Sequence, residues 1–262
     1  MNYVNELERS VYNHLTGAEN PQTGCVSYYT SLMGVKPYKC EITCCMSSVP
    51  RGIAMIPFFT NGQIDGKPSF LFYQAGVYKT RLSGNNTAVL FTTKTSFPEN
   101  VNVTIEVDPS VKTAFDVLLR KPYWAADFKV SVNGVEQKIT EKEVVSIKKT
   151  WQKGDKINVS FTMLVKILDG NVSYPNAIAV QRGPQVLVFD KKLNTVTAEN
   201  VQIPTGFQLQ DAVNILPKNW VGTQAYQLQT EVAGKVENII LVPYADASQT
   251  GGAVTTWLNK KK

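Results

Sequence analysis

The first feature of the sequence is a set of apolar residues spaced three and four positions apart near its start. Tyr3, Val4, Leu7, Val11 and Leu15 fall on one face of a helix at this spacing. We therefore predict a single amphipathic helix over residues 3–15. Gly17 follows as its expected C-cap, and Pro21 prevents further helix.

A second short helix is predicted to begin near residue 47 or 48. Ser47 or Ser48 is the expected N-cap, and Pro50 then falls in the first turn, where its missing N–H does no harm. Pro57 is expected to end the helix.

The pattern changes to strands from about Phe70 onward. Apolar and β-branched residues alternate in short runs separated by turn residues, which is typical of a sandwich or barrel. The dipeptide Asn133-Gly134 predicts a two-residue hairpin, and 153–155 predicts another turn. The predicted strands are 70–78, 88–93, 101–107, 115–119, 128–132, 144–148, 157–163, 178–181, 186–189, 239–242 and 255–258.

This uneven distribution predicts three parts. Residues 1–65 read as the end of a larger helical domain, since one amphipathic helix cannot bury its apolar face alone. Residues 66–170 are a β-sandwich domain, and 171–262 are a second β-rich portion. The alternative is a self-contained chain whose helix docks on a sheet.

Composition narrows the classes of function. The 262 residues carry 27 Lys and Arg against 21 Asp and Glu, and this small excess is spread along the chain, so nucleic acid is not expected as a partner. His14 is the one histidine, which excludes histidine-rich metal sites; we expect it to cap carbonyls at the end of the first helix. No apolar run is long enough to span a membrane, so no membrane partner is expected. The compartment stays open between cytoplasm and periplasm.

The cysteines are the most unusual local feature. A disulfide between adjacent Cys44 and Cys45 is strained, whereas two neighbouring thiolates suit a soft metal ion such as zinc. The other interpretation is that these two, with Cys25 and Cys40, are buried thiols that act as small apolar residues. Spacing alone leaves both open.

Aromatic and acidic residues offer a second set of candidates, which we expect to be structural. Trp124, Trp151, Trp220 and Trp257 suit sugar stacking but in strands are more often core residues. The carboxylates suggest a glycosidase pair, but each lies beside a turn, which favours solvated capping roles; they are Asp127, Glu136, Asp155 and Asp169.

Several motifs together resemble glycoside hydrolase family 127, the β-L-arabinofuranosidase family. The cysteine pair within Ile42-Thr43-Cys44-Cys45 and the following Val49-Pro50-Arg51-Gly52 look like the end of that family's catalytic domain. Two similar segments, 7–13 and 20–24, precede the cysteine pair and belong to the same catalytic-domain end. Others follow it in the family's order, and the resemblance covers about residues 3–190: 118–125, 130–134, 151–155 and 179–184.

The resemblance implies a fold and a mechanism. The fold is mainly β, with jelly-roll-like β-sandwich domains preceded by a short helical remnant of an (α/α)6 barrel. The mechanism is that of a retaining glycosidase acting on L-arabinofuranosyl or related plant-type glycans, in which Cys44 is the nucleophile and Cys44 and Cys45 are zinc ligands.

The family's remaining zinc ligands and its acid/base glutamate have no counterpart in this chain. We therefore expect an incomplete and inactive fragment that binds zinc weakly or not at all and lacks its N-terminal barrel domain as partner. The alternative function is a non-catalytic β-sandwich module that binds carbohydrate or serves as a scaffold.

Overall fold

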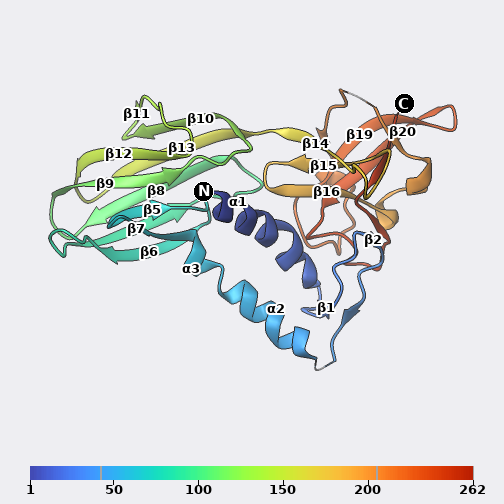
Figure 1. Ribbon diagram of the computed structural model, residues 1–262, viewed down its shortest axis with the longest axis horizontal. Helices are drawn as coiled ribbons and strands as arrows, with labels where there is room; N and C mark the ends of the chain where they lie inside the picture. The colour runs from blue at the N-terminus through green and yellow to red at the C-terminus, as the bar shows by residue number, and fades with distance from the viewer. Residues whose placement is uncertain (42, 205, 262) are drawn as a thin grey trace. The chain divides into compact units, whose positions relative to one another are not determined.

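The computed structural model describes residues 1–41, 43–204 and 206–261 (Figure 1), so Ile42 of the cysteine motif lies outside the described residues. The chain divides into two compact units. Unit 1 comprises Met1–Glu6 and Met55–Leu164, and unit 2 comprises Leu7–Ala54 and the chain from Val165 onward. Within the described residues, no helix combines the length and apolarity needed to cross a membrane.

The N-terminal helical segment is present but is not one α-helix. It consists of α1 (Asn2–Arg9), a π-helical turn η1 (Ser10–Leu15) and a 3-10 turn η2 (Thr16–Ala18). The C-cap predicted at Gly17 is wrong, because Gly17 lies inside η2. Its lack of a side chain serves packing instead, since a Cβ there would come within 2.9 Å of the Tyr244 ring.

The second helix starts earlier than predicted. Helix α2 spans Cys44–Ala54, so the expected N-cap at Ser47 or Ser48 is wrong and Pro50 lies in the helix interior. Thr43 explains the earlier start, because its Oγ1 accepts the N–H of Met46 at 3.4 Å and so serves as the N-terminal cap. Helix α3 (Pro57–Thr60) begins at the proline expected to end the previous helix.

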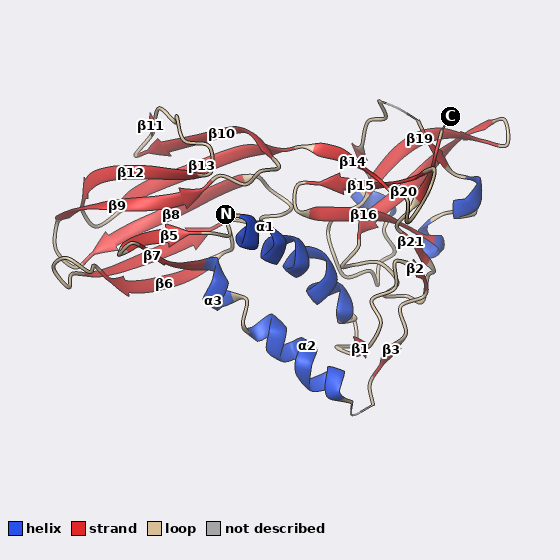
Figure 2. Ribbon diagram, in the orientation of Figure 1, coloured by secondary structure: helices blue, strands red, loops and turns tan. Residues whose placement is uncertain are grey.

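Unit 1 is a β-sandwich (Figure 2). Among the described residues its larger sheet has the strand order β11-β10-β13-β8-β7-β6, and its smaller sheet has the order β12-β9-β5-β4. Their bounds are β4 (Asn61–Ile64), β5 (Lys67–Phe70), β6 (Gly76–Arg81), β7 (Ala88–Lys94), β8 (Asn102–Pro109), β9 (Thr113–Arg120), β10 (Ala125–Val132), β11 (Val135–Glu136), β12 (Val144–Trp151) and β13 (Asp155–Met163).

Alternation along the strands places the apolar side chains between the two sheets. In β8, for example, Val103, Ile105 and Val107 are buried while the residues between them are partly exposed. The hairpin predicted at Asn133-Gly134 is confirmed: both residues have positive φ and join β10 to β11.

The single strand predicted over 70–78 is wrong. Phe70 ends β5 in the smaller sheet and Gly76 begins β6 in the larger one, so the chain crosses between sheets here. Phe72 and Tyr73 remain buried in this crossing, which is why the segment reads as a strand.

Unit 2 is built on another largely antiparallel sheet. Its main order among the described residues is β17-β22-β15-β16-β20-β19-β18, with β14 beside β15 and β21 beside both β16 and β2. The bounds are β1 (Val26–Ser27), β2 (Met33–Gly34), β3 (Tyr38–Lys39), β14 (Val165–Asp169), β15 (Ala177–Arg182), β16 (Gln185–Asp190), β17 (Gln202–Ile203), β18 (Gln210–Asp211), β19 (Tyr226–Val232), β20 (Lys235–Pro243), β21 (Val254–Thr255) and β22 (Leu258–Lys260); the 3-10 turns are η3 (Lys191–Leu193), η4 (Ala198–Asn200) and η5 (Val213–Ile215).

One buried side chain attaches the helical segment to the sheet of unit 2. The Asn13 amide donates to the carbonyl oxygens of Arg9 and Pro184 at 2.7 and 2.8 Å, and its oxygen accepts the N–H of Val186 at 2.7 Å. These hydrogen bonds hold the short helical part on the sheet of unit 2. Together, the strands of the two units confirm the expected mainly β class.

Candidate functional site

The two adjacent cysteines lie in the first turn of α2. Cys44 is exposed and Cys45 partly buried, and both are free thiols with their Sγ atoms 3.8 Å apart. Two thiolates bound about 2.3 Å from one tetrahedral ion lie about 3.8 Å apart, so this separation suits a shared metal. In the described part of the chain, no group of three or more Cys, His, Asp or Glu residues is placed to hold a metal.

The protein environment alone does not favour the charged form of the second thiol. Partial desolvation, a hydrogen bond with Cys44 and the charge of Cys44 together raise the pKa of the Cys45 thiol. A cation bound to both sulfur atoms would offset this upward shift of the Cys45 pKa.

Helix α2 is positioned by a close approach to η1. A Cβ on Gly52 would come within 2.9 Å of Leu15 Cδ1, so the glycine of the Val49-Pro50-Arg51-Gly52 motif allows the two helical segments to pack closely. No described residue of α2 is buried, and the helix carries its cysteines on an open surface.

Cys25 and Cys40 have a different role from their neighbours. They form a disulfide across a sequence separation of 15, and Cys40 is exposed. The interpretation of these two as buried thiols is therefore wrong. The bridge closes the segment that leads into α2.

A hollow of about 500 Å³ adjoins the start of α2 at Thr43. The rings of Tyr28 and Tyr29 form part of its wall, with their centroids 4.7 Å apart at 71°, and Lys39 adds a cation. Sequence reasoning missed these tyrosines because they lie in an irregular loop; an apolar pair within a Gly- and Ser-rich segment was their only signal.

The structural roles expected for the tryptophans hold for three of the four. Trp124, Trp151 and Trp220 are buried, whereas Trp257 is only partly buried and stacks on Tyr174. His14 does not cap a carbonyl through its ring; Nδ1 shares a hydrogen bond with Thr30 Oγ1 at 2.9 Å.

Asp169 acts as a local cap, as expected, whereas Asp127 accepts a hydrogen bond from the distant strand β13. Asp169 Oδ1 accepts the N–H of Asn171 at 2.8 Å, and Thr162 donates to Asp127 at 3.2 Å. Glu136 is exposed at the end of the hairpin. Asp155 differs from the expectation of a solvated cap because it is buried, where it accepts hydrogen bonds from Asn133 and Gln152.

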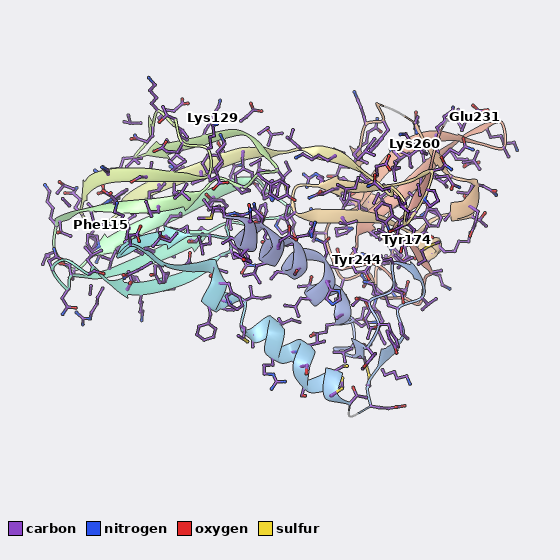
Figure 3. All side chains as sticks on the ribbon, in the orientation of Figure 1. Phe115, Lys129, Tyr174, Glu231, Tyr244 and Lys260 are labelled. Carbon is purple, nitrogen blue, oxygen red and sulfur yellow. A yellow bond between two sulfur atoms is a disulfide. The ribbon has the colours of Figure 1, made fainter. Side chains whose placement is uncertain are left out.

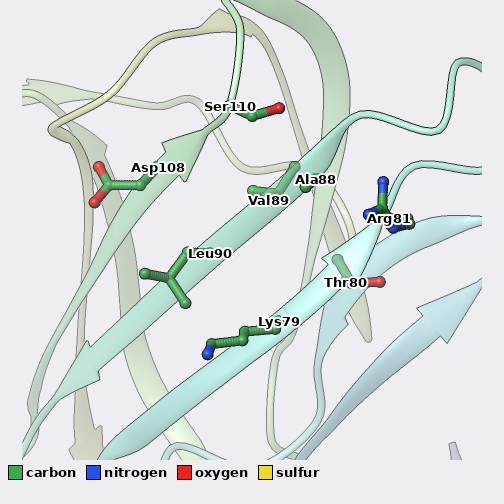
Figure 4. A pocket seen from close by; sticks show the side chains of 8 residues that line it. All are labelled: Lys79, Thr80, Arg81, Ala88, Val89, Leu90, Asp108 and Ser110. Atoms are coloured by element: carbon green, nitrogen blue, oxygen red, sulfur yellow. The ribbon is translucent and has the colours of Figure 1, made fainter.

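A groove on the larger sheet of unit 1 contains neither a nucleophilic thiol nor an aromatic ring (Figure 4). It has a volume of about 520 Å³ and is lined by β6, β7 and β8 together with Ser110, with Lys79 and Arg81 on one side and Asp108 on the other. Asp108 is the one carboxylate among its lining residues, so the groove does not offer the pair of carboxylates that most glycosidases use.

Comparisons with known proteins agree with the resemblance read from the motifs. Residues 71–163 match the family model described as beta-L-arabinofuranosidase, GH127 middle domain. No curated protein sequence matches the chain.

Solved structures extend the similarity in fold to the whole chain. A GH127 beta-L-arabinofuranosidase from Geobacillus stearothermophilus T6 superimposes with a TM-score of 0.87 at 21% identity, over 99% of this chain and 46% of its own. A GH127 beta-arabinofuranosidase gives 0.83 at 22% identity, over 99% and 46%. A structure titled glycoside hydrolase gives 0.83 at 19%, over 100% and 49%. The chain thus resembles glycoside hydrolase family 127 proteins and spans about half the length of these structures.

Proposed function

We propose that this chain is the C-terminal part of a retaining glycoside hydrolase that acts on L-arabinofuranosyl groups of plant-type glycans. The observation that carries the proposal is the exposed Cys44–Cys45 pair beside a hollow with two tyrosines, in a chain whose residues 71–163 match the GH127 middle domain. Cys44 is the nucleophile, and Cys44 and Cys45 are two of the ligands of a zinc ion.

The proposed chemistry of Cys44 is a double displacement. Its Sγ attacks the anomeric carbon while the bond to the leaving oxygen breaks, which gives a covalent thioglycoside. Water then displaces Sγ from the opposite face, so the configuration at that carbon is retained. When bound, zinc would keep the thiolates deprotonated at neutral pH.

The proposed site is incomplete in this chain. The general acid that protonates the leaving oxygen and the other zinc ligands would come from an N-terminal helical domain, as the lengths of the similar structures support. Positioned acid/base groups typically contribute about 10²–10⁴-fold to rate. We therefore expect the 262 residues alone to bind zinc weakly and to show no turnover.

The test compares cysteine variants of the full-length protein on p-nitrophenyl β-L-arabinofuranoside. Cys44→Ser is expected to lower kcat by at least about 10³-fold, because it removes the nucleophile. Ser48→Ala is the control, since it changes an exposed side chain on the same helix. Wild-type turnover by Cys44→Ser would disprove the assignment. Stoichiometric zinc on the dialysed 262-residue chain would disprove its incompleteness.

A further inference from the structure

A second cavity lies in unit 2, and it shares no lining residue with the hollow beside α2. It has a volume of about 440 Å³, which is within the range of small-ligand sites. Its wall combines η1, the loop at Thr30, strands β14 to β16, and Thr256 with Trp257. Arg9, the last residue of α1, also lines it, and no acidic residue of the described chain does.

Two polar atoms in this wall have no hydrogen-bond partner among the residues that the structure describes. They are Thr256 Oγ1 and Trp257 Nε1, and both are buried. Buried polar groups without partners are uncommon in native proteins, so each needs an explanation such as an absent ligand. By contrast, the Asn13 side chain in the same wall uses both its nitrogen and its oxygen.

Neighbouring contacts hold the rings of this cavity in place. The Trp257 indole stacks on the Tyr174 ring, with centroids 4.7 Å apart and planes at 14°. Tyr244 Oη donates to the carbonyl oxygen of Ser31 at 2.9 Å, and His14 is held by Thr30. Tyr174 and Tyr244 are labelled in Figure 3. Little ordering of these rings is then required when a ligand binds.

The chemistry of the wall suits a sugar ring. Leu168, Ala179 and Val186 offer an apolar surface for ring C–H groups. The indole N–H needs an acceptor, the threonine hydroxyl takes either role, and the imidazole of His14 is a further polar group. Sugar hydroxyl groups both donate and accept, so one pentose or hexose residue can satisfy all three.

We propose that this cavity is an accessory saccharide site that binds a single neutral sugar residue of a glycan. The choice of saccharide rests in part on the proposed function. The existence of the cavity does not depend on the proposed function, because neither Cys44 nor Cys45 lines it.

The experiment titrates the 262-residue chain with L-arabinose and methyl β-L-arabinofuranoside while the indole N–H signals of the four tryptophans are followed by NMR. The expected result is a saturable shift of the Trp257 signal that leaves Trp220 unmoved. Trp257→Phe and Thr256→Val are expected to weaken binding about 3–10-fold, as the loss of one hydrogen bond does.

Trp220→Phe is the matched control. Trp220 also has an indole nitrogen without a hydrogen-bond partner, but it lies outside this cavity. If Trp220→Phe weakens sugar binding as much as Trp257→Phe does, or if neither sugar gives a saturable shift, the site does not exist. Stronger binding of inorganic sulfate would overturn the neutral-sugar assignment.

The outcome is separable from the proposed function. Cys44→Ser is expected to leave sugar binding at this cavity unchanged. Thermal unfolding of each variant checks that the fold is intact, and Thr256→Val, which keeps the shape of the side chain, provides the test if Trp257→Phe is unstable.

Discussion

At the scale of single residues, several buried polar side chains fix the structure, and Lys36 is the clearest case. Its Nζ donates to the carbonyl oxygen of Tyr244 at 2.6 Å and lies 4.1 Å from the centre of the same ring. Burial lowers the pKa of Lys36 to about 7, against an opposing effect of Asp246 and Asp190. Burial also raises the pKa of Tyr244, to about 12.

Lys36 predicts a pH dependence of stability above neutrality. Between its folded pKa near 7 and the ordinary value of 10.5, the unfolded chain keeps a proton that the folded chain releases. The free energy of unfolding therefore rises with pH across this window, by at most about 1.4 kcal/mol per pH unit.

Urea unfolding at several pH values, followed on wild type and Lys36→Met, measures this contribution. The stability difference is expected to move in favour of wild type from pH 7 to 10. Lys39→Met, at an exposed position, is expected to show no such change. A difference between Lys36→Met and wild type that is constant with pH would contradict the assignment.

Asp155 predicts that the stability of the fold depends on pH in the acidic range. Burial raises its pKa, but hydrogen bonds from Asn133 and Gln152 and the charge of Lys149 outweigh this, and the net pKa lies below 3.8. Its contribution to stability is thus complete above the ordinary pKa and is lost as pH falls through the folded value.

Asp155→Asn is expected to lower the free energy of unfolding by about 1–3 kcal/mol at pH 7, with a smaller effect below about pH 4. Chemical denaturation at both pH values gives the comparison. Asp65→Asn changes an exposed turn aspartate and serves as the control. An equal loss at both pH values would show that the carboxylate charge is not involved.

At the scale of elements, Asn13 connects the helical segment to β16 and the turn before it through two hydrogen bonds, one to Pro184 and one to Val186. Asn13→Leu leaves the carbonyl of Pro184 and the N–H of Val186 without these partners. We expect a loss of about 2–4 kcal/mol in the unfolding of unit 2.

Hydrogen exchange at the Val186 amide measures this attachment directly, with faster exchange expected in Asn13→Leu. Asn2→Leu, an exposed change on α1, is expected to stay within about 0.5 kcal/mol of wild type. Unchanged protection of Val186 in Asn13→Leu would mean that the helical segment is held by other contacts.

The sequence predicts those elements whose cause is local. Alternating residues identified β8, and the positive φ required at Asn133-Gly134 identified the hairpin between β10 and β11. Sequence missed what distant contacts decide: the crossing between sheets after Phe70, and the pairing of Cys25 with Cys40. The candidate nucleophile was identified from its motif, but the hollow beside it depends on how a loop folds.

At the scale of the whole molecule, the chain has two β-rich units and resembles about half of each similar glycoside hydrolase structure. The division of the chain into 1–65, 66–170 and 171–262 that was expected from the sequence stays a prediction. So does the retaining mechanism, because the residues that would complete the site are expected outside the described chain.

The most direct test of the central claim is the mass of the peptide that contains Cys44 after rapid acid quenching of the full-length protein during turnover of an aryl β-L-arabinofuranoside. The account predicts an added pentosyl group that fragment ions place on Cys44 and not on Cys45, together with a product that retains its configuration. A pentosyl group on a carboxylate, or a product of inverted configuration with unmodified Cys44, would contradict it.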